Sequence, residues 1–136
     1  MQPTWKSHGF GMPWEKQYGY AQAIQVGPTL YISGQESHDM EANFVGAGDF
    51  ELQVRTTFAN LDRILAFYGA RKQHIVQTTV YVKERRRTFD AMARLHAEYF
   101  GEHRPTSTVL GVVDLALPPQ LVEIGAMVIV SAPPAG

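Results

Sequence analysis

The 136-residue sequence contains no cysteine, and this excludes disulfide bonds, thiolate catalysis and cysteine-ligated metals. Its five histidines show no spacing typical of a metal site, so no metal is expected. A charge excess of one sign is also lacking, because 12 basic residues stand against 13 acidic ones. The formal net charge of −1 gives no field that would favour nucleic acid or anionic lipid as a partner.

Long hydrophobic runs are missing too. The longest falls far short of a membrane span, and the first 19 residues lack the apolar core of a signal peptide. We therefore expect a cytoplasmic protein that does not contact a membrane. The length fits one domain with a single core over residues 1–136, with residues 1–19 as an irregular arm and residues 131–136 as a tail.

What the sequence does contain predicts an α+β fold. Apolar residues recur at helical spacing between Asp49, a plausible N-cap, and Gly69, and a second helix is expected from about Thr88 to Gly101. Segments rich in residues typical of strands predict extended structure at residues 20–26, 29–33, 75–82, 105–113 and 121–130.

Three smaller features receive interpretations from the residues alone. His38 and Asp39 fall in a polar segment and are interpreted as solvated, and Arg85-Arg86-Arg87 as a solvated turn between strand and helix. Trp5 and Trp14 flank the N-terminal arm, where they either cover a pocket or fix the arm by burial.

The last strand predicts an assembly. Two helices can cover only one face of a five- or six-stranded sheet, yet residues 121–130 (LVEIGAMVIV) are apolar on both faces. An exposed apolar patch of that size is unusual on a monomer. We therefore expect an oligomer to cover the second face.

Glu123 is the one carboxylate in this strand. Burying an ionised carboxylate costs several kcal/mol unless it is paired, hydrogen-bonded or protonated. Its strand neighbours have no side-chain donors, so we expect Glu123 at a subunit boundary beside a pocket. The residues alone equally allow a neutral or paired carboxyl that only stabilises an interface.

Four segments taken in order resemble the RidA/YjgF/L-PSP family: GYAQAIQVGPTLYISGQ, ELQVRTTFANLDRILAFYGA, IVQTTVYV and LVEIGAMV. The resemblance covers roughly residues 18–130. It implies a chorismate-mutase-like mixed sheet with two helices on one face, a homotrimer with pockets between subunits, and hydrolysis of small enamines or imines without metal or cofactor.

The resemblance also implies roles for individual residues. Glu123 matches the carboxylate that positions or activates the attacking water, which favours the pocket interpretation. Tyr20 matches the tyrosine before the first strand, and Ser33-Gly34-Gln35 matches the family's Ser-Gly-Gln, so Tyr20, Ser33 and Gly34 become candidate substrate contacts. From the residues alone, such a serine is more often a turn former than a ligand contact, and such a tyrosine is usually a packing residue.

The sequence departs from the family where an arginine of a Pro-x-Arg motif would bind the substrate carboxylate. Residues 105–107 are Pro-Thr-Ser, so Ser107 takes that substrate-binding position without the bidentate charge. Losing a charge-assisted bond costs about 1.5–3 kcal/mol. Ala93 and Gly125 replace an asparagine and a second glutamate, and Gly125 either widens the space beside Glu123 or simply packs within the sheet. The chain therefore resembles an arginine-lacking branch, with weak activity on 2-aminoacrylate-type substrates.

Two functions stay open from the sequence, and a third is disfavoured. The first is a metal-free imine hydrolase with Glu123 as its catalytic residue. The second is a trimer that binds a small ligand without turnover. An endoribonuclease that inhibits translation is disfavoured because the chain has neither a basic groove nor a histidine pair suited to RNA cleavage.

Overall fold

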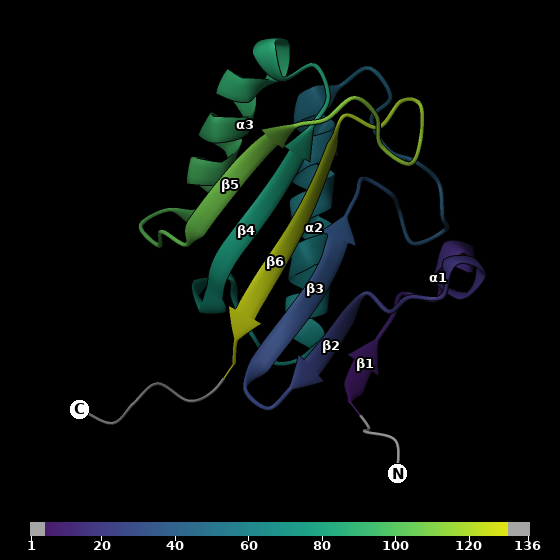
Figure 1. Ribbon diagram of the computed structural model, residues 1–136, viewed down its shortest axis with the longest axis vertical. Coiled ribbons are helices and arrows are strands. Elements are labelled where there is room, and N and C mark those ends of the chain that lie inside the picture. Colours follow the sequence, from purple (N-terminus) through teal and green to yellow (C-terminus); the bar gives the residue numbers. More distant parts are fainter. Residues whose placement is uncertain (1–4, 131–136) are drawn as a thin grey trace.

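The protein is built on a mixed six-stranded sheet (Figure 1). The computed structural model describes residues 5–130. In chain order the elements are β1 (Lys6–His8), α1 (Pro13–Tyr18), β2 (Ala23–Val26), β3 (Thr29–Gln35), α2 (Phe50–Phe67), η1 (Lys72–His74), β4 (Ile75–Val82), α3 (Arg85–Phe100), β5 (Thr106–Gly111) and β6 (Val122–Ile129).

The strand order is β1-β2-β3-β6-β4-β5, and every neighbouring pair is antiparallel except β4 and β5. The parallel pair is joined through α3, as a parallel connection requires a crossover. Gly27 and Pro28 form the tight turn between β2 and β3, and Gly27 adopts a positive φ of 58° that glycine tolerates without strain. β6 therefore lies in the middle of the sheet, between β3 and β4.

Both long helices pack on one face of the sheet, α2 against β3 and β6 and α3 against β4 (Figure 1). Asp49 caps α2 by accepting a hydrogen bond from the Leu52 amide at 3.0 Å. The core between helices and sheet consists mainly of fully buried aliphatic side chains: Leu30, Val54, Leu61, Ile64, Val80, Val82, Met92, Val122, Ile124 and Val128. The other face of the sheet has no cover from residues 5–130, and Tyr31 and Leu110 on that side are 50% and 44% exposed.

The expected α+β fold, with two helices on one face, is confirmed. The N-terminal arm is a correction, because residues 1–19 were expected to be irregular but contain β1 and α1. β1 forms through pairing with β2, and α1 starts at a proline and ends at Gly19. Neither the pairing of β1 nor the proline and glycine that bound α1 produce a periodic hydrophobic pattern. The sequence analysis therefore missed both elements. The proposed tail, 131–136, lies outside the described residues.

Two further interpretations need correction. Arg85, Arg86 and Arg87 are exposed, as expected, but their secondary structure differs. Arg85-Arg86-Arg87 is the first turn of α3 rather than a loop, because the chain reverses one residue earlier, at Glu84, whose φ is 52°. His38 is buried at 4% exposure, since the Asn60 side chain binds its carbonyl and the rings of Phe10 and Trp14 pack against its imidazole.

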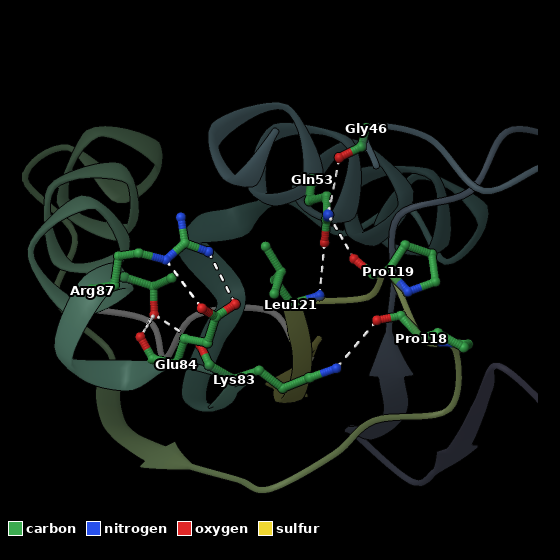
Figure 2. Close-up of polar contacts among 9 residues, drawn as sticks. Gly46, Gln53, Lys83, Glu84, Arg87, Pro118, Pro119 and Leu121 are labelled. Atoms are coloured by element: carbon green, nitrogen blue, oxygen red, sulfur yellow. Dashed lines mark hydrogen bonds and ion pairs between the residues drawn. The ribbon is translucent and has the colours of Figure 1, made fainter. Parts of the chain in front are cut away.

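Buried Gln53 of α2 holds the segment that leads into β6 (Figure 2). Its amide nitrogen donates to the carbonyls of Gly46 and Pro119 at 2.9 and 3.0 Å, and its oxygen accepts from the Leu121 amide at 2.8 Å. Lys83 adds a bond to the Pro118 carbonyl at 3.2 Å. These contacts fix where β6 begins, and hence where Glu123 lies.

Replacing Gln53 by alanine will leave the partly buried carbonyl bonds of Gly46 and Pro119 and the buried Leu121 amide without their partner. We expect a loss of about 3 kcal/mol in the free energy of unfolding, since each unsatisfied group costs about 1–3 kcal/mol and water can reach some of them. Urea unfolding at matched protein concentration measures this, with exposed Gln73→Ala as the control. Equal stability of the two variants would contradict the anchoring role of Gln53.

Candidate active site around Glu123

Glu123 projects from β6 on the face of the sheet that the helices leave open. Its neighbours Val122 and Ile124 are fully buried against the helices, and strand alternation therefore directs Glu123 the other way. It pairs in register with Tyr81 of β4. The side chain is partly rather than fully buried, as expected for a carboxylate beside a pocket.

Gly34 makes room for this side chain. The register between β3 and β6 shifts between Ile32 and Gln35, so Ser33 and Gly34 form an irregular strand end beside β6. A Cβ atom on Gly34 would lie 1.9 Å from Glu123 Oε1 and 2.8 Å from its Cγ. The Glu123 side chain thus lies directly over a backbone position that only glycine leaves free.

A cavity of about 550 Å³ opens beside the Glu123 carboxylate. α1 forms one wall, and Figure 1 shows this helix beyond the end of β3. The segments after β3 and before β6 form the rest. We call it the Glu123 cavity; its lining residues are Pro13, Trp14, Gln17, Tyr18, Tyr20, Ser33, Gly34, Glu36, Ala42, Ala116, Leu117 and Glu123.

A chain of hydrogen bonds fixes α1 in this position. The Glu15 carboxylate accepts from the Phe10 amide at 2.9 Å and from the Gln22 side chain at 3.0 Å. Gln22 in turn accepts from the buried Gln35 amide at 2.8 Å. Since Gln35 directly follows Ser33 and Gly34, the network ties the helical wall to the strand end below Glu123.

The cavity contains a second carboxyl group, Glu36, which the sequence analysis missed. Burial raises the pKa of Glu36, and the charge of Glu123 raises it further. Burial also raises the pKa of Glu123, while the Gln120 side chain opposes that change. Glu36 follows Ser33-Gly34-Gln35 immediately. A carboxylate directly after the end of a strand was the sequence signal that could have identified it.

Tyr20 and Ser33 both line the cavity, but their hydroxyl groups are in different situations. Burial and then the negative charge of Glu36 raise the pKa of Tyr20, so its phenol keeps its proton at neutral pH. The Ser33 hydroxyl donates to the Ala21 carbonyl at 2.7 Å and therefore holds the backbone. Of the two tryptophans, Trp14 lines the cavity, whereas Trp5 is 51% exposed.

Ser107 does not line this cavity within one subunit, and its expected place at a substrate bound between subunits stays a prediction. Its oxygen accepts a hydrogen bond from the Thr78 hydroxyl at 2.8 Å, and Thr78 Oγ1 lies 2.9 Å from His96 Nε2 in α3. Thr78 and Ser107 are paired in register, so both face the helices rather than the open face. Within one subunit, the position of the missing arginine is thus turned away from the Glu123 cavity.

A second hollow of about 500 Å³ lies on the open face and shares Gly34 and Glu123 with the first. Gly125 lines it on the same face as Glu123, and a Cβ atom there would meet its nearest neighbour, Ile32 O, at an ordinary 3.7 Å. Packing within the subunit therefore does not require glycine at 125. Glu123 stands where the two hollows meet.

Residues 5–130 contain no group of three or more histidine, aspartate or glutamate side chains able to hold a metal ion. None of the helices described is long and apolar enough to cross a membrane.

This chain is similar in sequence to proteins of a known family. The model of the family described as Endoribonuclease L-PSP matches residues 14–130. A RutC family protein of Pyrococcus abyssi is 34% identical over 93 residues, which cover 68% of this chain and 72% of that protein. A 2-iminobutanoate/2-iminopropanoate deaminase of Dermatophagoides farinae is 27% identical over 111 residues, covering 82% of this chain and 85% of the other.

Solved structures agree with the fold. Rv2704 of Mycobacterium tuberculosis, a member of the YjgF/YER057c/UK114 family, superposes with a TM-score of 0.83 at 27% identity, covering 93% of this chain and all of the other. The mixed sheet and its two covering helices define an α+β domain of the fold that Rv2704 also has. The chain belongs to the RidA/YjgF/L-PSP family.

Proposed function

We propose that this protein is a metal-free hydrolase of a small imine or enamine, with Glu123 as the catalytic residue in a pocket completed by a neighbouring subunit. The observation that carries the proposal is the Glu123 carboxylate itself. It lies over Gly34 at the edge of a 550 Å³ cavity that also contains Glu36 and Tyr20. The deaminase of Dermatophagoides farinae supports the reaction class.

Imine hydrolysis needs a group that moves a proton between water and the leaving nitrogen. The Glu123 carboxylate takes a proton from water while the water oxygen attacks the imine carbon, forming a carbinolamine. The protonated carboxyl then gives that proton to nitrogen. As the C–N bond breaks, Glu123 accepts the hydroxyl proton and passes it to the departing nitrogen, so the carbonyl product and ammonia leave and the carboxylate is restored. A carboxyl with a raised pKa suits both directions of transfer.

The environment of Glu123 favours hydrolysis over RNA cleavage. Two carboxylates in one cavity repel the phosphates of a nucleic acid backbone. The net charge of −1 offers no compensating attraction.

A homotrimer is part of the proposal. Helices α2 and α3 cover one face of the sheet, and the hollow at Glu123 and Gly125 opens onto the other. A neighbouring subunit packed there would bury Tyr31 and Leu110 and close the site around Glu123.

We expect sedimentation equilibrium at micromolar concentration to give a mass of three times the 15.2 kDa subunit. Tyr31→Asp places a charge on the open face and should shift the mass toward one subunit, because a buried unpaired charge is costly. Leu52→Asp, at the 42% exposed Leu52 of α2, is the control. A wild-type mass near one subunit would overturn the trimer.

The proposed activity is tested with imines generated in situ by amino-acid oxidases and amine oxidases. Semicarbazide traps the imine that remains, so a hydrolase lowers semicarbazone formation. A wild-type protein that accelerates none of the reactions, but still binds a small ligand, would leave the non-catalytic binder as the function.

A further inference from the structure

The charge on the wall of the Glu123 cavity is unusual for a pocket that would bind an acid. Glu36 and Glu123 are its two charged lining residues, and the residues that line it in one subunit include no lysine, arginine or histidine. An anionic carboxylate placed there meets two like charges in a partly desolvated space. A positively charged ligand meets two opposite ones.

Three of the cationic side chains near this end of the sheet are engaged elsewhere. Lys83 lies 3.4 Å from Asp114 and bonds to the Pro118 carbonyl. Arg87 pairs with Glu84 at 3.0 Å, and Arg85 lies over the Phe89 ring. Ser107 occupies the position of the family's carboxylate-binding arginine and faces the helices. The residues that line the cavity in one subunit thus supply no cation to hold a substrate carboxylate.

The other walls suit a cation. Trp14 and Tyr18 come from α1, and Tyr20 and Leu117 also line the cavity, so aromatic and apolar surfaces accompany the two carboxylates. Aromatic faces attract a desolvated cation through their ring quadrupole. The hydrogen bonds of Glu15 hold α1 against the strand end, so this aromatic wall is in place before a ligand arrives.

We propose, building on the hydrolase function above, that the cavity selects a carboxylate-free iminium cation and that Glu36 is the residue that determines this specificity. The reaction is R₂C=NH₂⁺ + H₂O → R₂C=O + NH₄⁺, with Glu123 acting on water. Glu36 attracts the positive nitrogen and disfavours imino acids. Such cations arise when a primary amine transfers a hydride, that is two electrons and one proton, to an acceptor such as a flavin, so an amine-oxidising reaction must supply the substrate.

The test measures binding by calorimetry at pH 7.5 with three probes of similar size. Propanamidinium is a stable planar cation resembling an iminium, propanamide is its neutral counterpart, and 2-oxobutanoate is an anion. We expect wild type to bind propanamidinium at least tenfold more tightly than either of the others. Glu36→Gln should weaken propanamidinium binding about tenfold and leave propanamide unchanged, which also shows that the variant is folded.

Glu41→Gln is the matched control, because Glu41 is an exposed carboxylate in the same loop and does not line the cavity. Equal effects of the Glu36 and Glu41 variants, or tighter wild-type binding of 2-oxobutanoate than of propanamidinium, overturn the inference.

Turnover separates this inference from the proposed function. Imines from amine oxidation should be hydrolysed faster than imino acids such as 2-aminoacrylate and its tautomer. Faster hydrolysis of the imino acids overturns the cation specificity and leaves the hydrolase standing. A preference for propanamidinium with no hydrolysis of any imine supports the ligand class and overturns the hydrolase.

Discussion

Glu123→Gln will lower imine hydrolysis by about 10²- to 10⁴-fold, the contribution typical of a general acid–base group. Glutamine keeps the shape and hydrogen-bonding capacity of the side chain but cannot carry the proton from water to nitrogen. The measurement is kcat on whichever imine of the panel the wild type hydrolyses fastest. Full turnover in the variant would make Glu123 a bystander.

The same variant should not be less stable than wild type. Burial raises the pKa of Glu123 above its ordinary 4.5, so the folded state holds the proton more tightly than the unfolded chain. That stabilisation is present below pH 4.5 and is lost as pH rises through the raised pKa. At pH 7.5 we therefore expect a Tm equal to or above wild type, with the difference shrinking in acid. A trimer that falls apart in Glu123→Gln would instead assign Glu123 an interface role.

The pH profile of the wild type gives an independent check. Glu123 must be ionised to accept a proton from water, so kcat/KM should fall as pH drops through the pKa of Glu123, above the ordinary carboxyl range. An acid limb centred at or below pH 4.5 would contradict this role.

Gly34→Ala will remove most of the activity without touching a titrating group. The new methyl carbon would occupy space within 2.8 Å of three Glu123 side-chain atoms, including Cγ, so the carboxylate must move. Displacing a catalytic group by about 1 Å can cost about 10²-fold in rate. The loss should appear in kcat. The sedimentation mass of the variant checks that the trimer still assembles, and the acid limb of its pH profile checks the titration of Glu123.

Gly125→Ala is the matched control for this clash. It adds the same methyl group to the neighbouring strand, where its nearest neighbour lies at an ordinary 3.7 Å. A much smaller loss is expected. Equal losses in the two variants would show that crowding of the face, rather than displacement of Glu123, is responsible.

The sequence by itself determined the features that depend on local spacing. The long helices follow from apolar residues at helical intervals, and the buried residues Val54, Phe58, Leu61 and Leu65 lie where that period places them. Glu123 stood out because burying a carboxylate needs a reason wherever the strand lies. Counting two helices against one sheet also predicted the open face.

The tertiary structure decided the features that depend on which distant segments meet. Whether Glu36 faces solvent or a cavity depends on the position of α1. Hydrogen bonds of Glu15 and Gln22 hold this helix, which has no periodic apolar pattern in its sequence. The face that Ser107 occupies depends on its register with Thr78, a residue 29 positions away along the chain. Strand alternation determines which side chains of one strand share a face. Only strand pairing and packing determine which of the two faces is covered by the helices.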